Sequence, residues 1–245
     1  MSKAQMGPFP KSKAQIRQIA QSVLLSKIAP IVVASMGRSG STLVHDAICR
    51  GLAEARFGHS GRLATGLVAG YAWDLSAAPL RNGVAYKTHA LAEELDGRSD
   101  VKVVFLFGSA VDSAVSVINA RKVKGDAWIA SHFDHLRGEG GLAELAERDV
   151  LRFSDQLDGW TSLTSTPAIA MKYDSLWHNQ DSLSDFLGFP IALPPRRERS
   201  AKQVDSKILK RLQQTYALLE SRIAAMPDVI RSGPEEKAQA GMKNQ

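Results

Sequence analysis

The sequence predicts one α/β domain with a central parallel β-sheet flanked by helices. Two stretches rich in β-branched and apolar residues, 31–34 and 100–107, each run through a glycine into a segment with apolar residues at helical spacing. Two such strand–loop–helix units imply right-handed crossovers and therefore parallel strands. With 245 residues, 44 % of them hydrophobic, the chain is long enough to bury a full core.

The N-terminal half supplies shorter elements around these two strands. Residues 1–12 contain two prolines and are expected to form a flexible arm. An amphipathic helix over 14–27 is expected to pack against the sheet edge, with a membrane surface as the lesser alternative. The pattern then predicts loop with some helix over 57–70, a strand over 83–87, and a helical turn or two over 91–95.

The C-terminal half is predicted to continue the same fold. Its expected elements are a mostly helical stretch over 127–160 broken by glycines, a strand over 168–173, a helix near 182–187, an irregular basic segment over 190–200 and one long helix over 204–226. The polar residues 232–245 are expected to be a flexible tail. The domain itself would then span residues 13–231.

Charge and cysteine content narrow the function classes. The formal net charge of +6 favours an anionic ligand, but the Lys and Arg residues are scattered among acids, so nucleic acid is not expected. Cys49 is the only cysteine, which excludes an intrachain disulfide and suits a reducing compartment. Without a long apolar run or a secretory signal, the chain is expected to be cytoplasmic.

A glycine-rich turn follows the first strand and leads into a helix that begins near Ser41. In this geometry backbone N–H groups and the helix dipole bind an anion, and serine, threonine and arginine side chains add further donors. The predicted anion site consists of Gly37, Arg38, Ser39, Gly40, Ser41 and Thr42.

The turn differs from the common nucleotide-binding loop, which has Lys directly after its second glycine. Here Ser41 takes that place and Ser35 replaces the first glycine. A nucleoside-triphosphate-dependent kinase would also need an acidic magnesium ligand at the end of a strand, whereas residues 100–107 lead into Gly108. A kinase therefore remains a lesser alternative.

A second candidate segment, Lys87-Thr88-His89, follows the strand over 83–87. Open α/β sheets place their ligands at the carboxyl ends of the strands. Lys87 and His89 are two positions apart, so an extended backbone directs them to the same side. A cation beside an imidazole suits a reaction that holds an anion and deprotonates a hydroxyl.

Together these segments resemble the sulfotransferases. Residues 37–42 (GRSGST) are similar to their 5′-phosphosulfate-binding loop, and residues 87–89 (KTH) to the segment after their second strand. The resemblance implies a fold similar to that of P-loop enzymes, 3′-phosphoadenosine 5′-phosphosulfate (PAPS) as sulfonate donor, adenosine 3′,5′-bisphosphate (PAP) as product, and no metal. It also implies a small-molecule or carbohydrate hydroxyl as acceptor. His89 would be the general base, with Lys87 and Arg38 at the transferring group.

A third segment, residues 107–117, looks like the family's 3′-phosphate segment. Asp112 and Ser116 stand where that pattern has Asp and Ser, which implies that Ser116 holds the 3′-phosphate. Gly108 replaces the arginine that pairs with this phosphate, and the cations that could take over are Arg121, Arg196, Arg197 and Arg199. Tyr173 resembles a family tyrosine near the adenine, while Leu43 stands in place of the usual adenine-stacking tryptophan.

The substitutions at Gly108 and Leu43 leave one further alternative. A non-catalytic anion-binding or interaction protein on a degenerate sulfotransferase scaffold would carry the same loop. His132 and His135 could offer metal ligands, but the spacing sets up no third and fourth ligand. Residues 127–160 are expected to shape the acceptor pocket, and the sequence fixes neither the acceptor nor the oligomeric state.

Overall fold

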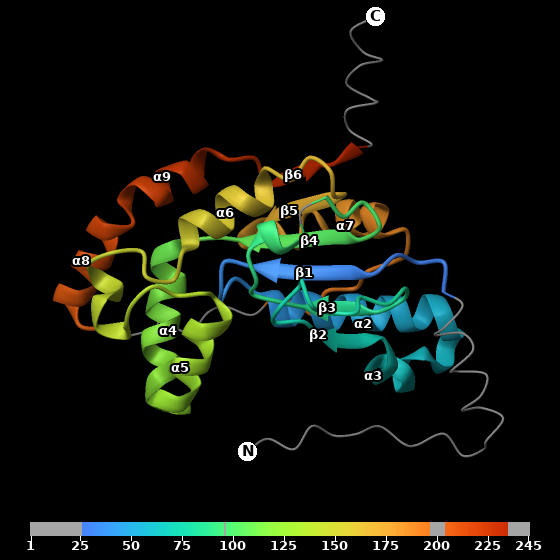
Figure 1. Ribbon diagram of the computed structural model, residues 1–245, viewed down its shortest axis with the longest axis horizontal. Coiled ribbons are helices and arrows are strands. Elements are labelled where there is room, and N and C mark those ends of the chain that lie inside the picture. Colours follow the sequence, from blue (N-terminus) through green and yellow to red (C-terminus); the bar gives the residue numbers. More distant parts are fainter. Residues whose placement is uncertain (1–25, 96, 197–203, 235–245) are drawn as a thin grey trace, which may run out of the picture.

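A computed structural model describes residues 26–95, 97–196 and 204–234. A six-stranded sheet forms its centre, in the order β2-β3-β1-β4-β5-β6, and β6 alone among these strands pairs antiparallel (Figure 1). The strands are β1 Ile31–Ser35, β2 Ala69–Tyr71, β3 Ala85–Lys87, β4 Lys102–Phe107, β5 Ala168–Lys172 and β6 Val229–Ser232. The predicted fold class, one α/β domain with a central, mostly parallel sheet, is confirmed.

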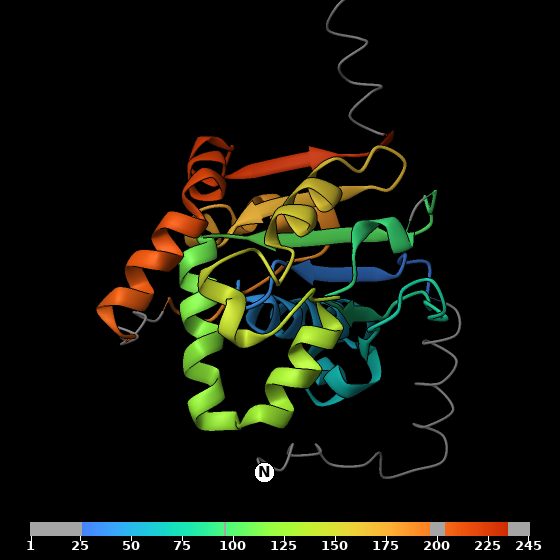
Figure 2. The same ribbon diagram turned by 60° about the vertical axis from the view of Figure 1, so that its left-hand side comes forward.

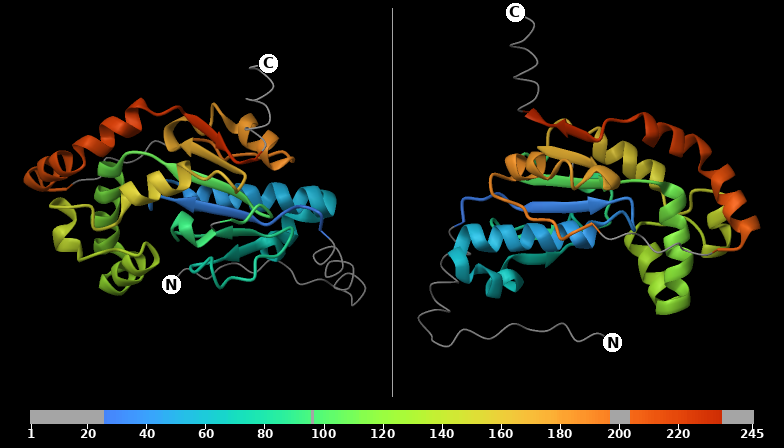
Figure 3. Two further views of the ribbon diagram at one scale, coloured as in Figure 1. Left: turned by 45° about the horizontal axis from the view of Figure 1, so that its top comes forward. Right: turned by 180° about the vertical axis from the view of Figure 1, so that it is seen from behind.

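Helices cover both faces of this sheet (Figure 3). The α-helices are α2 Ser41–Phe57, α3 Thr65–Val68, α4 Ala110–Lys124, α5 Asp126–His135, α6 Phe153–Thr161, α7 Gln180–Leu187, α8 Ser206–Thr215 and α9 Ala217–Ala225. The 3-10 helices are η1 Gly58–Ala64, η2 Ala92–Leu95, η3 Leu142–Ala146 and η4 Tyr173–Ser175. Among the described helices, none has the length and hydrophobicity needed to cross a membrane.

The central strands are apolar on both sides because each side packs against helices. Val32 and Phe105 belong to one core cluster, which α4, α5, α6, α8 and α9 complete. Val33 and Val104 belong to the other, which α2, α3 and α7 complete. Cys49, on α2, is buried in this second cluster.

This topology reverses direction at the carboxyl ends of β1 and β4. These strands are neighbours, yet the helix after β1 covers one face and the helix after β4 joins the other. Open α/β sheets bind their ligands at such a reversal. The arrowhead of β1 points toward the α4–α5 hairpin, which extends beyond the strand ends (Figures 1 and 2).

Three elements differ from the sequence predictions. Strand β2 lies in the segment predicted as loop with helix, since it pairs with β3 despite lacking β-branched residues. The single C-terminal helix is divided at Tyr216, whose buried hydroxyl donates to the carbonyl of Leu145, 3.3 Å away. Ser232, predicted to begin the tail, ends β6 instead. The expected arm over 1–12 and nearly all of the helix over 14–27 lie outside the described residues.

A candidate anion-binding active site

The loop between β1 and α2 has a backbone that few sequences could adopt. Gly37, Arg38 and Gly40 have φ values of 78°, 55° and 86°, all in the left-handed region that favours glycine. Arg38 is an exception there, and such strained residues cluster at functional sites. Gly40 is the N-cap of α2, and within this described helix no side chain caps the end and no acid occupies the first turn. The helix N-terminus is therefore arranged to meet an anion.

Hydroxyl groups fix the loop to its neighbours. The backbone N–H of Gly37 donates to Ser35 Oγ over 3.3 Å, and Ser39 Oγ donates to the carbonyl of Gly37 over 3.2 Å. Ser39 Oγ also lies 3.4 Å from Ser113 Oγ on α4. Ser39 is buried, so its side chain braces the loop from within the protein.

Arg38 connects the loop to the α4–α5 hairpin. Its Nε donates to Ser116 Oγ over 2.9 Å, which joins two predicted donor-binding residues that are 78 positions apart. Its guanidinium carbon lies 5.8 Å from the centre of the Trp128 ring, and Lys124 Nζ lies 4.6 Å from the same ring. These contacts place two cations and a hydroxyl near one edge of the loop.

Lys87 reaches the loop from β3. Its Nζ donates to Thr42 Oγ1 over 2.7 Å, in the first turn of α2. Burial lowers the pKa of Lys87, and repulsion by Arg38 and Lys124 lowers it further, whereas Asp46 opposes the shift. A second positive charge near the amino end of α2 would favour a multiply charged anion.

His89 lies at the same edge and is buried. Its Nδ1 is 3.5 Å from Ser35 Oγ, the long limit of a hydrogen bond, and Gln156 Nε2 donates to its carbonyl over 2.9 Å. Burial lowers the pKa of His89 to about 3, with repulsion by His132 and Lys87 acting in the same direction. The imidazole is therefore neutral at pH 7 and able to accept a proton.

Helix α5 forms the opposite wall. A Cβ placed on Gly37 would lie 3.2 Å from Leu136 Cδ1 and 3.7 Å from His132 Cε1, so this helix sits directly over the loop. His132 stacks on Trp128 with ring centres 4.7 Å apart. Burial lowers the pKa of His132 to about 4, with repulsion by Arg38 and His135 adding to the effect.

Tyr173 closes the loop at its other end. A Cβ on Gly40 would overlap ring carbons of Tyr173, and a Cβ on Gly108 would lie 3.4 Å from Tyr173 Cβ. Gly108, which replaces the arginine of the resembled pattern, therefore lies next to Tyr173, the residue predicted to lie near the adenine. Trp177 meets the Tyr173 ring edge-on, with ring centres 5.6 Å apart.

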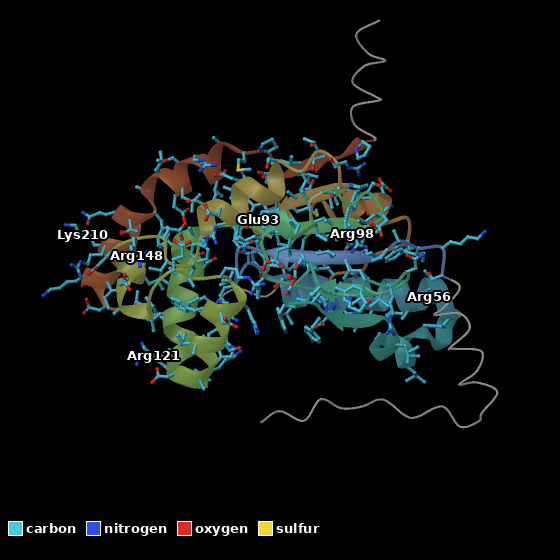
Figure 4. The ribbon with its side chains drawn as sticks, viewed as in Figure 1. Arg56, Glu93, Arg98, Arg121, Arg148 and Lys210 are labelled. Atoms are coloured by element: carbon cyan, nitrogen blue, oxygen red, sulfur yellow. The ribbon has the colours of Figure 1, made fainter. Side chains whose placement is uncertain are left out.

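The four arginines considered as replacements for that missing charge differ in position. Arg196 Nη2 donates to Asp174 over 3.2 Å, and its guanidinium carbon lies 5.6 Å from the Trp177 ring, close to Tyr173. Arg121 pairs with Asp126 beside the turn of the hairpin, and Figure 4 shows it on the outer side. Arg197 and Arg199 lie outside the described residues. Of the two candidate arginines that the structure describes, Arg196 lies closer to Tyr173 and therefore to Gly108, where the arginine is missing.

The structure thus gathers every predicted site residue around one edge of the sheet. The loop residues 37–42, Lys87 and His89 lie at the carboxyl ends of β1 and β3, while Ser116 and Tyr173 flank the loop on opposite sides. Sequence reasoning placed residues 127–160 at the acceptor pocket, but it did not assign Ser113, Lys124, Trp128 or His132 to the anion site. The four-residue spacing of Trp128 and His132 was the available signal, but only the hairpin fold brings them, and Lys124 at the end of α4, to the loop. In the described ranges no group of three or more His, Cys, Asp or Glu is arranged to hold a metal ion.

No protein-family model and no curated protein matches the sequence. Among solved structures, the chain is similar to the crystal structure of mouse sulfotransferase SULT7A1 complexed with PAP, at 14 % sequence identity. The match covers 84 % of this chain and 70 % of that one, with a TM-score of 0.38. A likeness of this degree assigns no family, so the function is inferred from the residues of the site.

Proposed function

We propose that this protein transfers a sulfonate group from PAPS to a hydroxyl acceptor, a small molecule or a carbohydrate. The observation that carries the proposal is the convergence of three features at the carboxyl edge of the sheet. These are the left-handed loop at the start of α2, the hydroxyl-paired cations Arg38 and Lys87, and the buried neutral imidazole of His89. The site suits a polyanion and a proton transfer together.

The residues of the loop fit the 5′ end of such a donor. Glycines at 37 and 40 allow the left-handed backbone of the loop, and Ser41 and Thr42 stand at the helix N-terminus. We assign the 3′-phosphate to Ser116, supported by Arg196, and the adenine to the neighbourhood of Tyr173. This assignment rests on the resemblance in sequence and on the contacts that bring Ser116 and Tyr173 to different sides of the loop.

The reaction we propose is a single in-line displacement. A bond forms between the acceptor oxygen and sulfur while the bond from sulfur to the 5′-phosphate oxygen breaks, and His89 takes the acceptor proton. Arg38 and Lys87 neutralise charge on the sulfonate and on the leaving phosphate. Positioning and electrostatics then supply most of the rate, as in phosphoryl transfer. A bound polyanion would also raise the pKa of His89, making it a better base when the donor is present.

Turnover of PAPS by wild-type protein and by His89→Ala tests the role of His89. We expect PAP release with a panel of hydroxyl acceptors, and a loss of about 10²-fold or more in the variant, the range for general acid–base groups. The variant should retain its affinity for PAP. His178→Ala removes an exposed imidazole outside the site and serves as the control. Near-normal turnover by His89→Ala removes His89 from the mechanism.

A non-catalytic anion-binding protein is the second candidate, and Gly108 favours it because the arginine expected there is missing. The same assay separates the two. Tight PAP binding without PAPS turnover on any acceptor class would favour the binding protein. Turnover of ATP instead of PAPS would favour a kinase.

A further inference from the structure

His132 has a buried nitrogen without a protein partner. Its side chain is 6 % exposed, and among the described residues its Nε2 is the one buried side-chain nitrogen or oxygen that makes no hydrogen bond. Buried polar atoms in folded proteins are nearly always paired, so an exception at a site points to a missing ligand. The atom belongs to helix α5, on the wall that faces the anion loop.

The position of the ring is fixed by its neighbours. Trp128 stacks on it at 4.7 Å with an interplanar angle of 13°, and His89 meets it edge-on at 5.7 Å and 88°. Its Cε1 is the atom that would lie 3.7 Å from a Cβ on Gly37. Because Nε2 is bonded to Cε1, the unpaired nitrogen lies next to the loop and near the proposed base.

We propose that His132 is an anion-binding residue whose Nε2–H donates to an oxygen of the phosphosulfate group on the Gly37–Gly40 loop. The inference extends the proposed function, because it names a contact in that same site. His132 would close the anion site from the side opposite the loop. A neutral imidazole would give the anion a directional hydrogen bond without placing a third positive charge beside Arg38 and Lys87.

A purely structural role for His132 makes a different prediction. If the ring only fills space against Trp128, then a phenylalanine should preserve the stack and leave ligand binding unchanged. If Nε2 is a ligand contact, His132→Phe should weaken anion binding while leaving the thermal stability of the empty protein equal or higher, because it removes an unpaired buried nitrogen. His132→Gln should restore binding, since its amide nitrogen can stand near the place of Nε2.

Calorimetry on the full chain with inorganic pyrophosphate and with PAP tests this inference. Pyrophosphate serves as a minimal mimic of the phosphosulfate group. We expect His132→Phe to bind both probes about fivefold more weakly than wild type, the effect of one hydrogen bond, and His132→Gln to stay within about twofold. Equal affinities of wild type and His132→Phe overturn the inference, as do equal losses in both variants.

The two probes keep this inference separate from the proposed function. Pyrophosphate binding that depends on His132, without any binding of PAP, supports the anion contact and overturns PAPS as the donor. PAP binding that is insensitive to His132→Phe supports the donor and overturns the role of His132. If neither probe binds the wild-type protein, both proposals fall.

Discussion

Substituting Gly40 with alanine tests the site most sharply, because the chain contains a matched control. Gly40 has φ 86° and ψ 8°, and a Cβ there would overlap ring carbons of Tyr173. Gly188, at the end of α7, has φ 84° and ψ 17°, and a Cβ there would meet nothing within 4 Å. Both substitutions force alanine into the left-handed region, but only Gly40→Ala adds a steric conflict.

The magnitudes follow from these two costs. Left-handed backbone at alanine costs about 1–2 kcal/mol, which we expect for Gly188→Ala. Overpacking adds about 1–3 kcal/mol, so Gly40→Ala should lower the free energy of unfolding by about 2–5 kcal/mol. The entropy that alanine removes from the unfolded chain is the same at both positions and cancels in the comparison.

Urea unfolding of Gly40→Ala, Gly188→Ala, Tyr173→Ala and the double variant Gly40→Ala with Tyr173→Ala measures the steric part. The double-mutant cycle should show a favourable interaction term, because removing the ring relieves the conflict. Calorimetry should show a loss of PAP affinity of about tenfold or more for Gly40→Ala and none for Gly188→Ala. Equal destabilisation by the two single substitutions, with no interaction term, would refute the packing of Tyr173 on the loop.

Three further predictions concern the phosphate contacts and pH. Ser116→Ala should weaken PAP about fivefold and leave adenosine 5′-monophosphate (AMP) unaffected in calorimetry; equal losses for both ligands would contradict the assignment of Ser116 to the 3′-phosphate. Arg196→Ala should narrow the preference for PAP over AMP by about tenfold, and an unchanged ratio would exclude Arg196 as the replacement for the missing charge. The pKa values of His89 and His132, about 3 and 4, lie below the ordinary value of 6.5, so the unfolded chain binds more protons between pH 6.5 and 4. Their contribution to stability is present above pH 6.5 and is lost as the pH falls, by roughly 1–2 kcal/mol per imidazole at pH 5. Urea unfolding should therefore show that the free energy of unfolding falls less between pH 7 and pH 5 for His132→Phe than for wild type. The same pH dependence of this free energy in both proteins would argue against a buried neutral His132.

The fold was predictable where local pattern and tertiary packing agree. Strands β1 and β4 are buried on both faces, and their nearly continuous runs of apolar residues predict this burial. Strand β2 reads Ala-Gly-Tyr, and of these residues only the tyrosine favours extended structure, so the pairing with β3 decides it. At Tyr216 the apolar spacing continues, so the break between α8 and α9 depends on a buried hydroxyl that finds its partner far away in the chain.

The site was predictable to a similar degree and for similar reasons. The loop after β1 is a local feature, since glycine, arginine and hydroxyl residues follow one another in six positions. The Arg38–Ser116 pair is long-range, and a resemblance in sequence rather than spacing placed both residues at the donor. His132 was considered only as a metal ligand together with His135, because the sequence does not show which elements its helix packs against. The structure places its ring near Gly37, and the role we propose for it depends on that placement.

Calorimetric titration of the wild-type protein with PAP and with AMP, at one fixed salt concentration because the site is cationic, tests the central claim most directly. We predict a preference for PAP of more than about tenfold, or about 1.4 kcal/mol, which would mean that the 3′-phosphate is recognised despite Gly108. Equal affinities for the two ligands, or no binding of either, would contradict a PAPS-dependent sulfotransferase.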